Sequence, residues 1–252
     1  MKLKNPLQRS LSPRALRMVS GGVWHEEPSE RAEVARLLGS YGIEPTEALL
    51  CFQEQFGGLE YQIRGRPEGW RFGLVGNGVD YLIDSQFAKA LDHRTEQLSF
   101  AMHYLSGEIF VNDYSGWIPI ASSAGMLIES DAMIDELVDA WETGVYVMLG
   151  YYAREDFSFN EALLHIGLDF VTVSEASDKY TTWWAGKRFR IIRKALYYSP
   201  LPLDCIELYA RDVTEARQLA AAFIEQGVMK QGAKISCFPH PFQPAPVYQG
   251  RP

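Results

Sequence analysis

The stretch PTEALLCFQEQFGGLE at residues 45–60 predicts a helix that turns directly into a strand. Its apolar residues recur at helical spacing, and the helix is expected to end at the pair Gly57-Gly58. A helix that reverses into a strand within two residues needs a positive φ at its end, which glycine adopts without a Cβ clash. We expect Gly57 or Gly58 to fill this structural role and to contact no ligand.

Regular patterns continue on both sides of this corner. Upstream, acids and a proline precede an apolar helical repeat that ends at Gly42. Downstream, alternation over residues 59–63 predicts a strand with one buried face, and residues 97–120 predict a meander of three strands. A helical pattern closes this unit near residue 142. Residues 21–142 are therefore expected to form one α+β domain.

Residues 143–238 are expected to form an additional α+β layer or a second small domain. A short helix ends at Gly167, and a second helix begins at Asp212, whose spacing to Glu215 resembles a capping box. The predicted strands of this part are residues 170–173, 180–184, 189–192, 205–209 and 235–238. Residues 1–20 predict a basic arm or first element, and the proline-rich residues 239–252 predict an extended tail.

Size and composition are those of a globular protein. The chain has 252 residues, of which 47% are hydrophobic and 22% charged, so it suits one large domain or two small ones. No apolar run reaches the length of about 20 residues that spans a bilayer, and no membrane contact is expected. The 3 cysteines form neither a CxxC clamp nor a disulfide framework, which favours a reducing, cytoplasmic setting.

Charge is distributed unevenly along the chain. Residues 1–20 carry a net charge of +5, residues 21–150 carry −14, and residues 151–252 carry +1. An acidic segment disfavours nucleic acid and favours a cationic protein, although acidic surfaces also serve solubility alone. The carboxylates expected to lie at loops or element ends, and so to contact a partner, are Glu26, Glu27, Asp80, Asp84, Glu129 and Asp131.

One basic segment is the best candidate for nucleic-acid binding. Aromatic residues 180, 183 and 184 precede the basic residues Lys187, Arg188, Arg190, Arg193 and Lys194. Aromatics interleaved with basic groups are typical of single-strand binding. However, arginines that alternate with Phe189 and Ile191 are also typical of an ordinary strand with one wet face, which is the interpretation we favour.

Catalytic and metal-binding patterns are weak. The 5 histidines lack HExxH or HxH spacing, and neither a GxSxG elbow nor a phosphate-binding loop occurs. Cys51 and Cys205 are interpreted as inert core thiols. The pairs Asp80/Asp84 and Asp131/Asp135 are interpreted as solvated helix faces.

We therefore expect no cofactor, no metal and no enzymatic activity. The alternative is an enzyme whose dispersed residues meet in a cleft between residues 21–142 and the later layer. In that case His103 or His165 would serve as the acid or base.

The corner at residues 56–58 resembles the hallmark of the SUKH superfamily, in which a helix ends in a Phe-Gly-Gly or Tyr-Gly-Gly corner and passes into a strand. Three further stretches are similar to family segments, namely GVWHEE at 22–27, GEIFV at 107–111 and IASS at 120–123. The resemblance covers about residues 20–142, and residues 143–252 do not follow the family pattern.

The resemblance implies a mixed sheet packed against helices. It also implies an immunity protein that binds and neutralises a secreted bacterial toxin, often a nuclease, while fungal relatives regulate cell-wall assembly. Together with the charge, it leads us to expect a non-catalytic module that binds a cationic, nuclease-type toxin.

Overall fold

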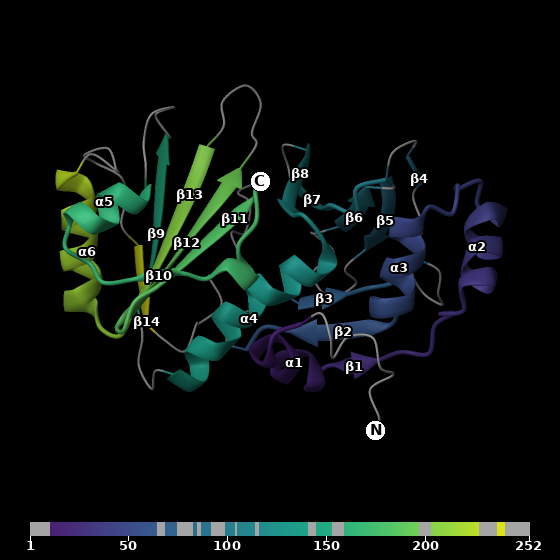
Figure 1. The fold of residues 1–252 in the computed structure, drawn as a ribbon, viewed down its shortest axis with the longest axis horizontal. Coiled ribbons are helices and arrows are strands. Elements are labelled where there is room, and N and C mark those ends of the chain that lie inside the picture. Colours follow the sequence, from purple (N-terminus) through teal and green to yellow (C-terminus); the bar gives the residue numbers. More distant parts are fainter. Residues whose placement is uncertain are drawn as a thin grey trace, which may run out of the picture.

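The computed structural model describes an α+β protein with six α-helices and three antiparallel sheets in its described part (Figure 1). The described residues are 11–64, 69–74, 83–84, 87–91, 99–103, 105–113, 116–140, 145–152, 159–196, 203–226 and 236–239. The expected α+β class is confirmed. The helices are α1 (Pro13–Ser20), α2 (Arg31–Ser40), α3 (Glu47–Phe56), α4 (Ala124–Ala140), α5 (Phe159–His165) and α6 (Val213–Glu225).

The first sheet contains β1 (Val23–Trp24), β2 (Leu59–Gln62) and β3 (Gly69–Arg71), in that order. The second contains β4 (Ile83–Asp84), β5 (Phe87–Leu91), β6 (Ser99–His103), β7 (Ile109–Asp113) and β8 (Gly116–Ala121). The predicted meander of β6, β7 and β8 is confirmed. Residues 21–142 thus form two antiparallel sheets among the described strands, so the mixed sheet that the SUKH resemblance implies is not established.

The corner between α3 and β2 has the predicted geometry. Thr46 caps the start of α3, and the helix ends at Phe56. Gly58 has a φ of +83°, its N–H donates to the Phe72 carbonyl at 2.8 Å, and its carbonyl accepts from the His25 N–H at 2.8 Å. A Cβ at Gly58 would collide with the His25 carbonyl, so space as well as φ requires glycine. Gly57 has an ordinary φ of −56°.

An aromatic cluster fills the space under this corner. The rings of Phe52, Phe56 and Tyr61 surround Phe72, with ring centroids 5.6, 6.0 and 5.8 Å from it. All three contacts are edge-on, the arrangement in which the positive ring edge meets the negative ring face. Such pairs contribute about 0.5–1.5 kcal/mol each beyond the burial of their area. The cluster therefore fixes α3 against β2 and the end of β3.

The third sheet lies on the opposite side of the molecule from the first two sheets (Figure 1). Its six strands are, in spatial order, β10 (Val171–Thr172), β11 (Thr181–Ala185), β12 (Phe189–Leu196), β13 (Leu203–Ala210), β9 (Val145–Tyr152) and β14 (Ser236–Pro239). Helices α5 and α6 cover one face of this sheet (Figure 1). Their apolar residues, among them Leu163 and Phe223, form a cluster with Trp184, Ile191 and Ile206.

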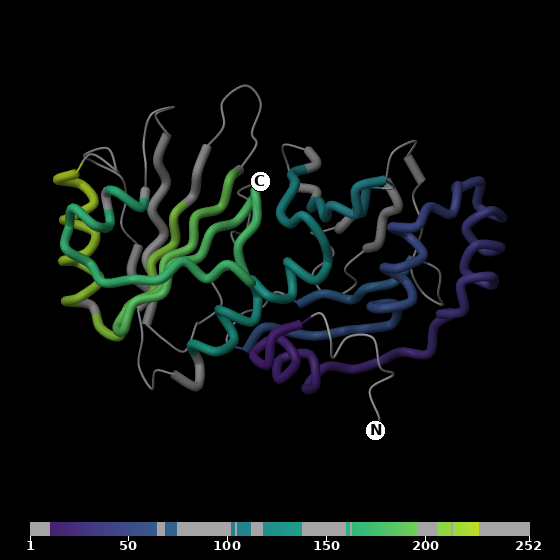
Figure 2. Tube along the Cα trace, viewed as in Figure 1, coloured from purple at the N-terminus to yellow at the C-terminus, as the bar shows by residue number. Residues whose placement is uncertain are grey.

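Helix α4 joins the two sides (Figures 1 and 2). One continuous core contains residues of α1, α3 and α4 together with Val173, Trp183, Ile192 and Tyr209 from the later part of the chain. The Trp183 indole N–H also donates to the Ser130 hydroxyl of α4 at 2.9 Å. The apolar core therefore crosses the boundary expected near residue 142.

The described part of the basic N-terminal segment belongs to this core. Helix α1 buries Ala15, Met18 and Val19 and packs against α4. Of the two roles considered for residues 1–20, an arm or a first element, residues 13–20 therefore form a first element.

Candidate functional site

The acidic residues predicted to contact a partner are placed in two different ways. Glu26 is exposed on a loop, as expected. Glu129 and Asp131 lie within α4 and are buried, so the prediction that they lie at loops or element ends is wrong. Asp80 lies outside the described residues, and for Asp84 only the backbone in β4 is described.

Glu129 and Asp131 each tether another element to α4. Glu129 accepts hydrogen bonds from the backbone N–H and the hydroxyl of Ser12, the residue that caps α1. Asp131 accepts from the Tyr61 hydroxyl at 2.8 Å, and burial raises the pKa of Tyr61, so this phenol stays protonated as the donor. These carboxylates are internal because α1 and β2 pack over the face of α4 that carries them.

Asp135 repeats this pattern one turn further along α4. Its carboxylate accepts from the Arg64 guanidinium at 2.7–3.0 Å and from the Arg64 backbone N–H at 3.0 Å. Asp131 and Asp135 do share one helix face, but the expectation of a solvated face is wrong because both are buried. The reason is that Tyr61 of β2 and Arg64, which follows β2, pack against α4 and supply their partners.

Glu27 is internal as well, although it follows the exposed Glu26. Its side chain is 1% exposed and lies 3.5 Å from the Arg71 guanidinium. Loss of solvent raises the pKa of Glu27, while the hydrogen bond from Gln53 and the charge of Arg71 oppose that rise. Gln53 is fully buried and donates to the Glu27 carboxylate and the Pro28 carbonyl, while its own carbonyl accepts from the Leu74 N–H at 2.6 Å. Glu27 is therefore a buried structural residue, and the prediction that it contacts a partner at the surface is wrong.

Among the residues whose burial is described, the exposed carboxylates of the first half lie in or next to α2 and α3, at one end of the molecule (Figure 1). We call this surface the acidic end face; its members are Glu26, Glu30, Glu33, Glu44, Glu47 and Glu54. Arg31 pairs with Glu47 and Glu54. The other four carboxylates make no ion pair within the described ranges of the chain. The exposed Tyr41 ends α2 on the same unit.

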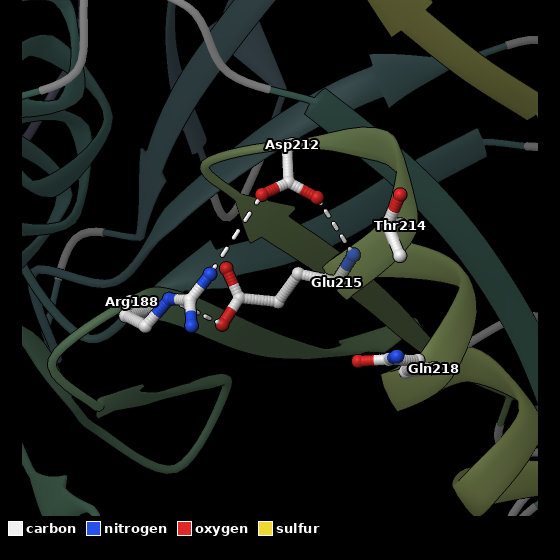
Figure 3. Close-up of a pocket in the computed structure, with 5 residues that line it drawn as sticks. All are labelled: Arg188, Asp212, Thr214, Glu215 and Gln218. Atoms are coloured by element: carbon white, nitrogen blue, oxygen red, sulfur yellow. Dashed lines mark hydrogen bonds and ion pairs between the residues drawn. The ribbon is translucent and has the colours of Figure 1, made fainter.

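Two of the five cations of the basic segment, Arg188 and Lys194, pair with neighbouring acids. An open hollow of about 590 Å³ is lined by Arg188, Asp212 and Glu215. Figure 3 shows the Arg188 guanidinium pointing at both carboxylates. Its nitrogens lie 3.7 Å from an Asp212 oxygen and 3.1 Å from a Glu215 oxygen. Asp212 also accepts the Glu215 backbone N–H, so the N-terminus of α6 is already capped. Lys194 pairs with the buried Glu207 at 2.6 Å.

The Arg190 side chain folds back onto the turn that precedes β12. It donates to the carbonyls of Gly186 and Phe189, and burial lowers the pKa of its guanidinium. Residues 189–196 form β12, so the predicted strand is confirmed, but the expected wet face is wrong because Ile192 on that face is fully buried. Few of its cations remain available to phosphates.

A second hollow, of about 390 Å³, is lined by Arg14, Arg17 and Arg64 together with Asp135 and Glu136. Arg14 lies 3.8 Å from Glu136 and Arg17 lies 3.4 Å from it, while Arg64 is held by Asp135. Each arginine therefore has a carboxylate within reach. Glu129 and Glu175 also lie 3.8 and 2.9 Å from Arg14, so the three arginines face four carboxylates and the network offers an anion no excess of positive charge.

The two histidines that the alternative enzyme hypothesis named lie on different elements, β6 and α5. His103 lies 3.0 Å from the Ser106 hydroxyl in the turn between β6 and β7, whereas His165 is exposed at the end of α5. Cys51 is partly buried and donates to Glu47, and this hydrogen bond together with burial raises the pKa of its thiol. A raised pKa disfavours the nucleophilic thiolate. Within the described residues, no group of three His, Cys, Asp or Glu side chains is placed to hold a metal ion.

A third cavity, of about 190 Å³, lies where α4, β3 and β8 meet β11 and β12. We call it the seam cavity. Its apolar lining includes Ile63, Leu127 and Ile134, and its polar lining includes Asp131, Thr181 and Lys194. Trp70 also lines it. No sequence pattern indicated this cavity, because its walls come from five separate elements.

Comparison with family models, curated proteins and solved structures found no match to this chain. Of the helices that the structure describes, none combines the length and the apolar character that crossing a bilayer requires.

Proposed function

We propose that this protein is a non-catalytic binding module that recognises a cationic protein through the acidic end face. The observation that carries the proposal is the contrast between buried and exposed carboxylates. Glu27, Glu129 and Asp131 have partners inside the molecule, whereas Glu26, Glu30, Glu33 and Glu44 are exposed and unpaired among the described residues. Unpaired surface carboxylates concentrated at one end attract a basic surface.

The chemistry of this end suits protein recognition. Residues 26–54 carry seven carboxylates and two arginines, and Arg31 is occupied by Glu47 and Glu54. Tyr41 is 48% exposed and offers an amphipathic ring of the kind that often anchors interfaces. A cluster of carboxylates can imitate the charge of a phosphate backbone, so a nuclease with a basic groove is the partner class we propose.

The resemblance of the helix-strand corner to the SUKH superfamily supports the more specific form of this proposal. In that form the chain is an immunity protein that acts in the cytoplasm and neutralises a nuclease-type toxin. The corner itself supports the fold around Gly58 and lies apart from the proposed contact surface, because Gly58 is buried.

The experiment compares two charge-reversed variants that change the net charge equally. Glu26→Lys plus Glu44→Lys alters the acidic end face, and Asp169→Lys plus Glu225→Lys alters exposed acids on the other side of the molecule. The probe is a purified basic nuclease domain of the class proposed as the partner. At low salt, the first variant should associate about three- to tenfold more slowly, with a weaker salt dependence, because rim charges act mainly on the association rate.

The control variant should associate nearly as the wild type does. Equal slowing by both variants would show that net charge alone matters, and no slowing by either would remove the acidic end face as the contact surface. Melting curves of all three proteins establish that each is folded.

A further inference from the structure

The turn between β6 and β7 exposes a large apolar side chain that the charges of the acidic end face do not account for. Leu105 is 80% exposed, more than any other large apolar side chain whose burial is described. Its neighbours Ser106 and Gly107 are of the types that turns favour. A single exposed leucine is common on protein surfaces. What distinguishes Leu105 is how firmly its turn is held and where that turn lies.

Several hydrogen bonds hold this turn in one conformation. The Gly107 N–H donates to the His103 carbonyl at 3.0 Å, and the His103 N–H donates to the Glu108 carbonyl at 3.0 Å. The Ser106 N–H donates to Nδ1 of His103 at 3.3 Å. Gly107 has a φ of +73°, which glycine adopts without strain. Leu105 is therefore presented on a preorganised backbone, and preorganisation lowers the entropy that binding costs.

Contacts from the later part of the chain fix the turn further. The Glu108 carboxylate accepts from the Tyr180 hydroxyl at 2.7 Å and pairs with Lys179. It also accepts from the Ser106 hydroxyl at 2.9 Å. The turn that carries Leu105 is thus held from both of its ends and from a neighbouring element.

The turn lies next to the acidic end face. A Cβ built on Gly107 would lie 3.8 Å from the Cβ of Ala48, so the turn packs against the first turn of α3. Ala48 follows the exposed Glu47, and the exposed Glu44 lies just before the helix. Leu105 is two residues from Gly107, which the chain spans within about 7 Å. An exposed apolar side chain therefore borders the carboxylates of this face.

This combination matches the anatomy of protein interfaces. Stable interfaces have an apolar core within a polar rim. Rim charges mainly speed association, whereas close apolar packing mainly slows dissociation. Leu105 supplies the apolar element, and Glu44 and Glu47 supply the charges beside it. The complementary surface is that of a basic protein with an apolar pocket among its cations.

We propose that Leu105 is the apolar anchor of the acidic end face and that it enters an apolar pocket on the cationic partner. This inference rests on the proposed function, because the carboxylates beside the turn select a basic partner. The two proposals predict different kinetics. The carboxylates act on the association rate, and Leu105 acts on the dissociation rate.

The test measures the kinetics of binding to a purified basic nuclease domain, the probe used for the charge-reversed variants. Leu105→Ser should dissociate about ten times faster than the wild type, with its association rate and salt dependence unchanged. Leu105→Met keeps an apolar side chain of similar size and should dissociate nearly as slowly as the wild type. Because Leu105 is exposed, both variants should melt as the wild type does.

Leu164→Ser is the matched control, because Leu164 is 64% exposed on α5 at the other side of the molecule. This variant should dissociate as the wild type does. The methyl resonances of Leu105 in the wild-type protein, assigned with Leu105→Met, give a measurement that needs no stable variant. They should shift when the probe binds, while those of Leu164 stay unmoved.

The outcomes separate this inference from the proposed function. If Glu26→Lys plus Glu44→Lys slows association but Leu105→Ser dissociates normally and the Leu105 methyls stay unmoved, the anchor is overturned and the acidic end face remains. Equal acceleration of dissociation in Leu105→Ser and Leu164→Ser would also overturn the anchor. If neither the charge reversals nor Leu105→Ser change the kinetics, both proposals are wrong.

Discussion

The two sides of the molecule differ in how the chain connects their elements. The first side is made of residues 11–140, and the second is made of the six-stranded sheet. In the first, many connections are local: α3 turns into β2 at Gly58, and β6, β7 and β8 pair in order, although α1 packs against the distant α4. In the second, β9 lies between β13 and β14, which follow it much later in the chain. The first side depends on a few special backbone positions, whereas the second depends on many ladder contacts. Single substitutions should therefore damage the first side more.

The largest difference is expected between two glycines of positive φ, one on each side. Gly58 has a φ of +83° and Gly167 a φ of +77°, but only at Gly58 would a Cβ meet other atoms, those of His25. Gly58→Val should lower the free energy of unfolding by about 3–4 kcal/mol, through backbone strain and the displaced His25 segment. Gly167→Val should cost only the strain, about 1–2 kcal/mol. Urea denaturation measures both.

Equal losses at the two glycines would contradict the role of crowding at the corner. The loss of unfolding free energy in Gly57→Val gives a third comparison. Gly57 has an ordinary φ, and the space for a side chain there is limited by the nearby Gln53. A stable Gly57→Val would show that Gln53 can move aside.

The next effect concerns Gln53, the buried amide that joins α3 to residues 27–28 and to the end of β3. Gln53→Leu keeps a side chain of similar size but removes the partner of the Leu74 N–H and of the Pro28 carbonyl, and leaves the Glu27 carboxylate with Arg71 alone. Leaving buried polar groups unpaired should cost about 2–3 kcal/mol, measured by urea denaturation. Gln55→Leu is the control, because Gln55 lies on the same helix and is only partly buried. A loss of equal size at Gln55 would show that helix α3 simply disfavours the substitution.

The fold of the first side could be predicted to a large extent because its signals are local. The pair Gly57-Gly58, the alternation after it and the turn at Gly107, which has a φ of +73°, are all read within a few residues. Strand β9 was not predicted, although its continuous apolar run VYVMLGYY is typical of a strand covered on both faces. Its position between β13 and β14 depends on pairing across the chain, which no local pattern contains.

The candidate site was less predictable for the same reason. Burial of Glu129 and Asp131 follows from α1 and β2 lying over α4, and the seam cavity is walled by separate elements. Gln53 did give a signal, because it occupies a position on the stripe of Leu49 and Phe56 where a core residue is expected. A polar residue on such a stripe indicates a buried hydrogen-bonding role.

The smallest effect is expected at Glu108, which holds the two sides together. This carboxylate comes from the turn before β7 and accepts from the Tyr180 hydroxyl at 2.7 Å and the Ser106 hydroxyl at 2.9 Å, beside the ammonium of Lys179. Hydrogen bonds from Lys179, Tyr180 and Ser106 lower the pKa of Glu108 to about 2. A lowered pKa means that the carboxylate stabilises the fold above its ordinary pKa near 4.5, and that this stabilisation is lost as the pH falls toward 2.

Glu108→Gln keeps an acceptor for Tyr180 but removes the charge that Lys179 faces. Because Lys179 is exposed and its attraction is screened, the variant should lose only about 1 kcal/mol at pH 7. The difference from the wild type should shrink steadily between pH 4.5 and pH 2, since protonation then removes the same charge from the wild type. Urea denaturation across this range measures it, with Glu44→Gln as the control, because the exposed Glu44 makes no ion pair among the described residues. A difference that stays constant from pH 7 to pH 2 would mean that Glu108 joins the two sides by its shape and hydrogen bonding alone.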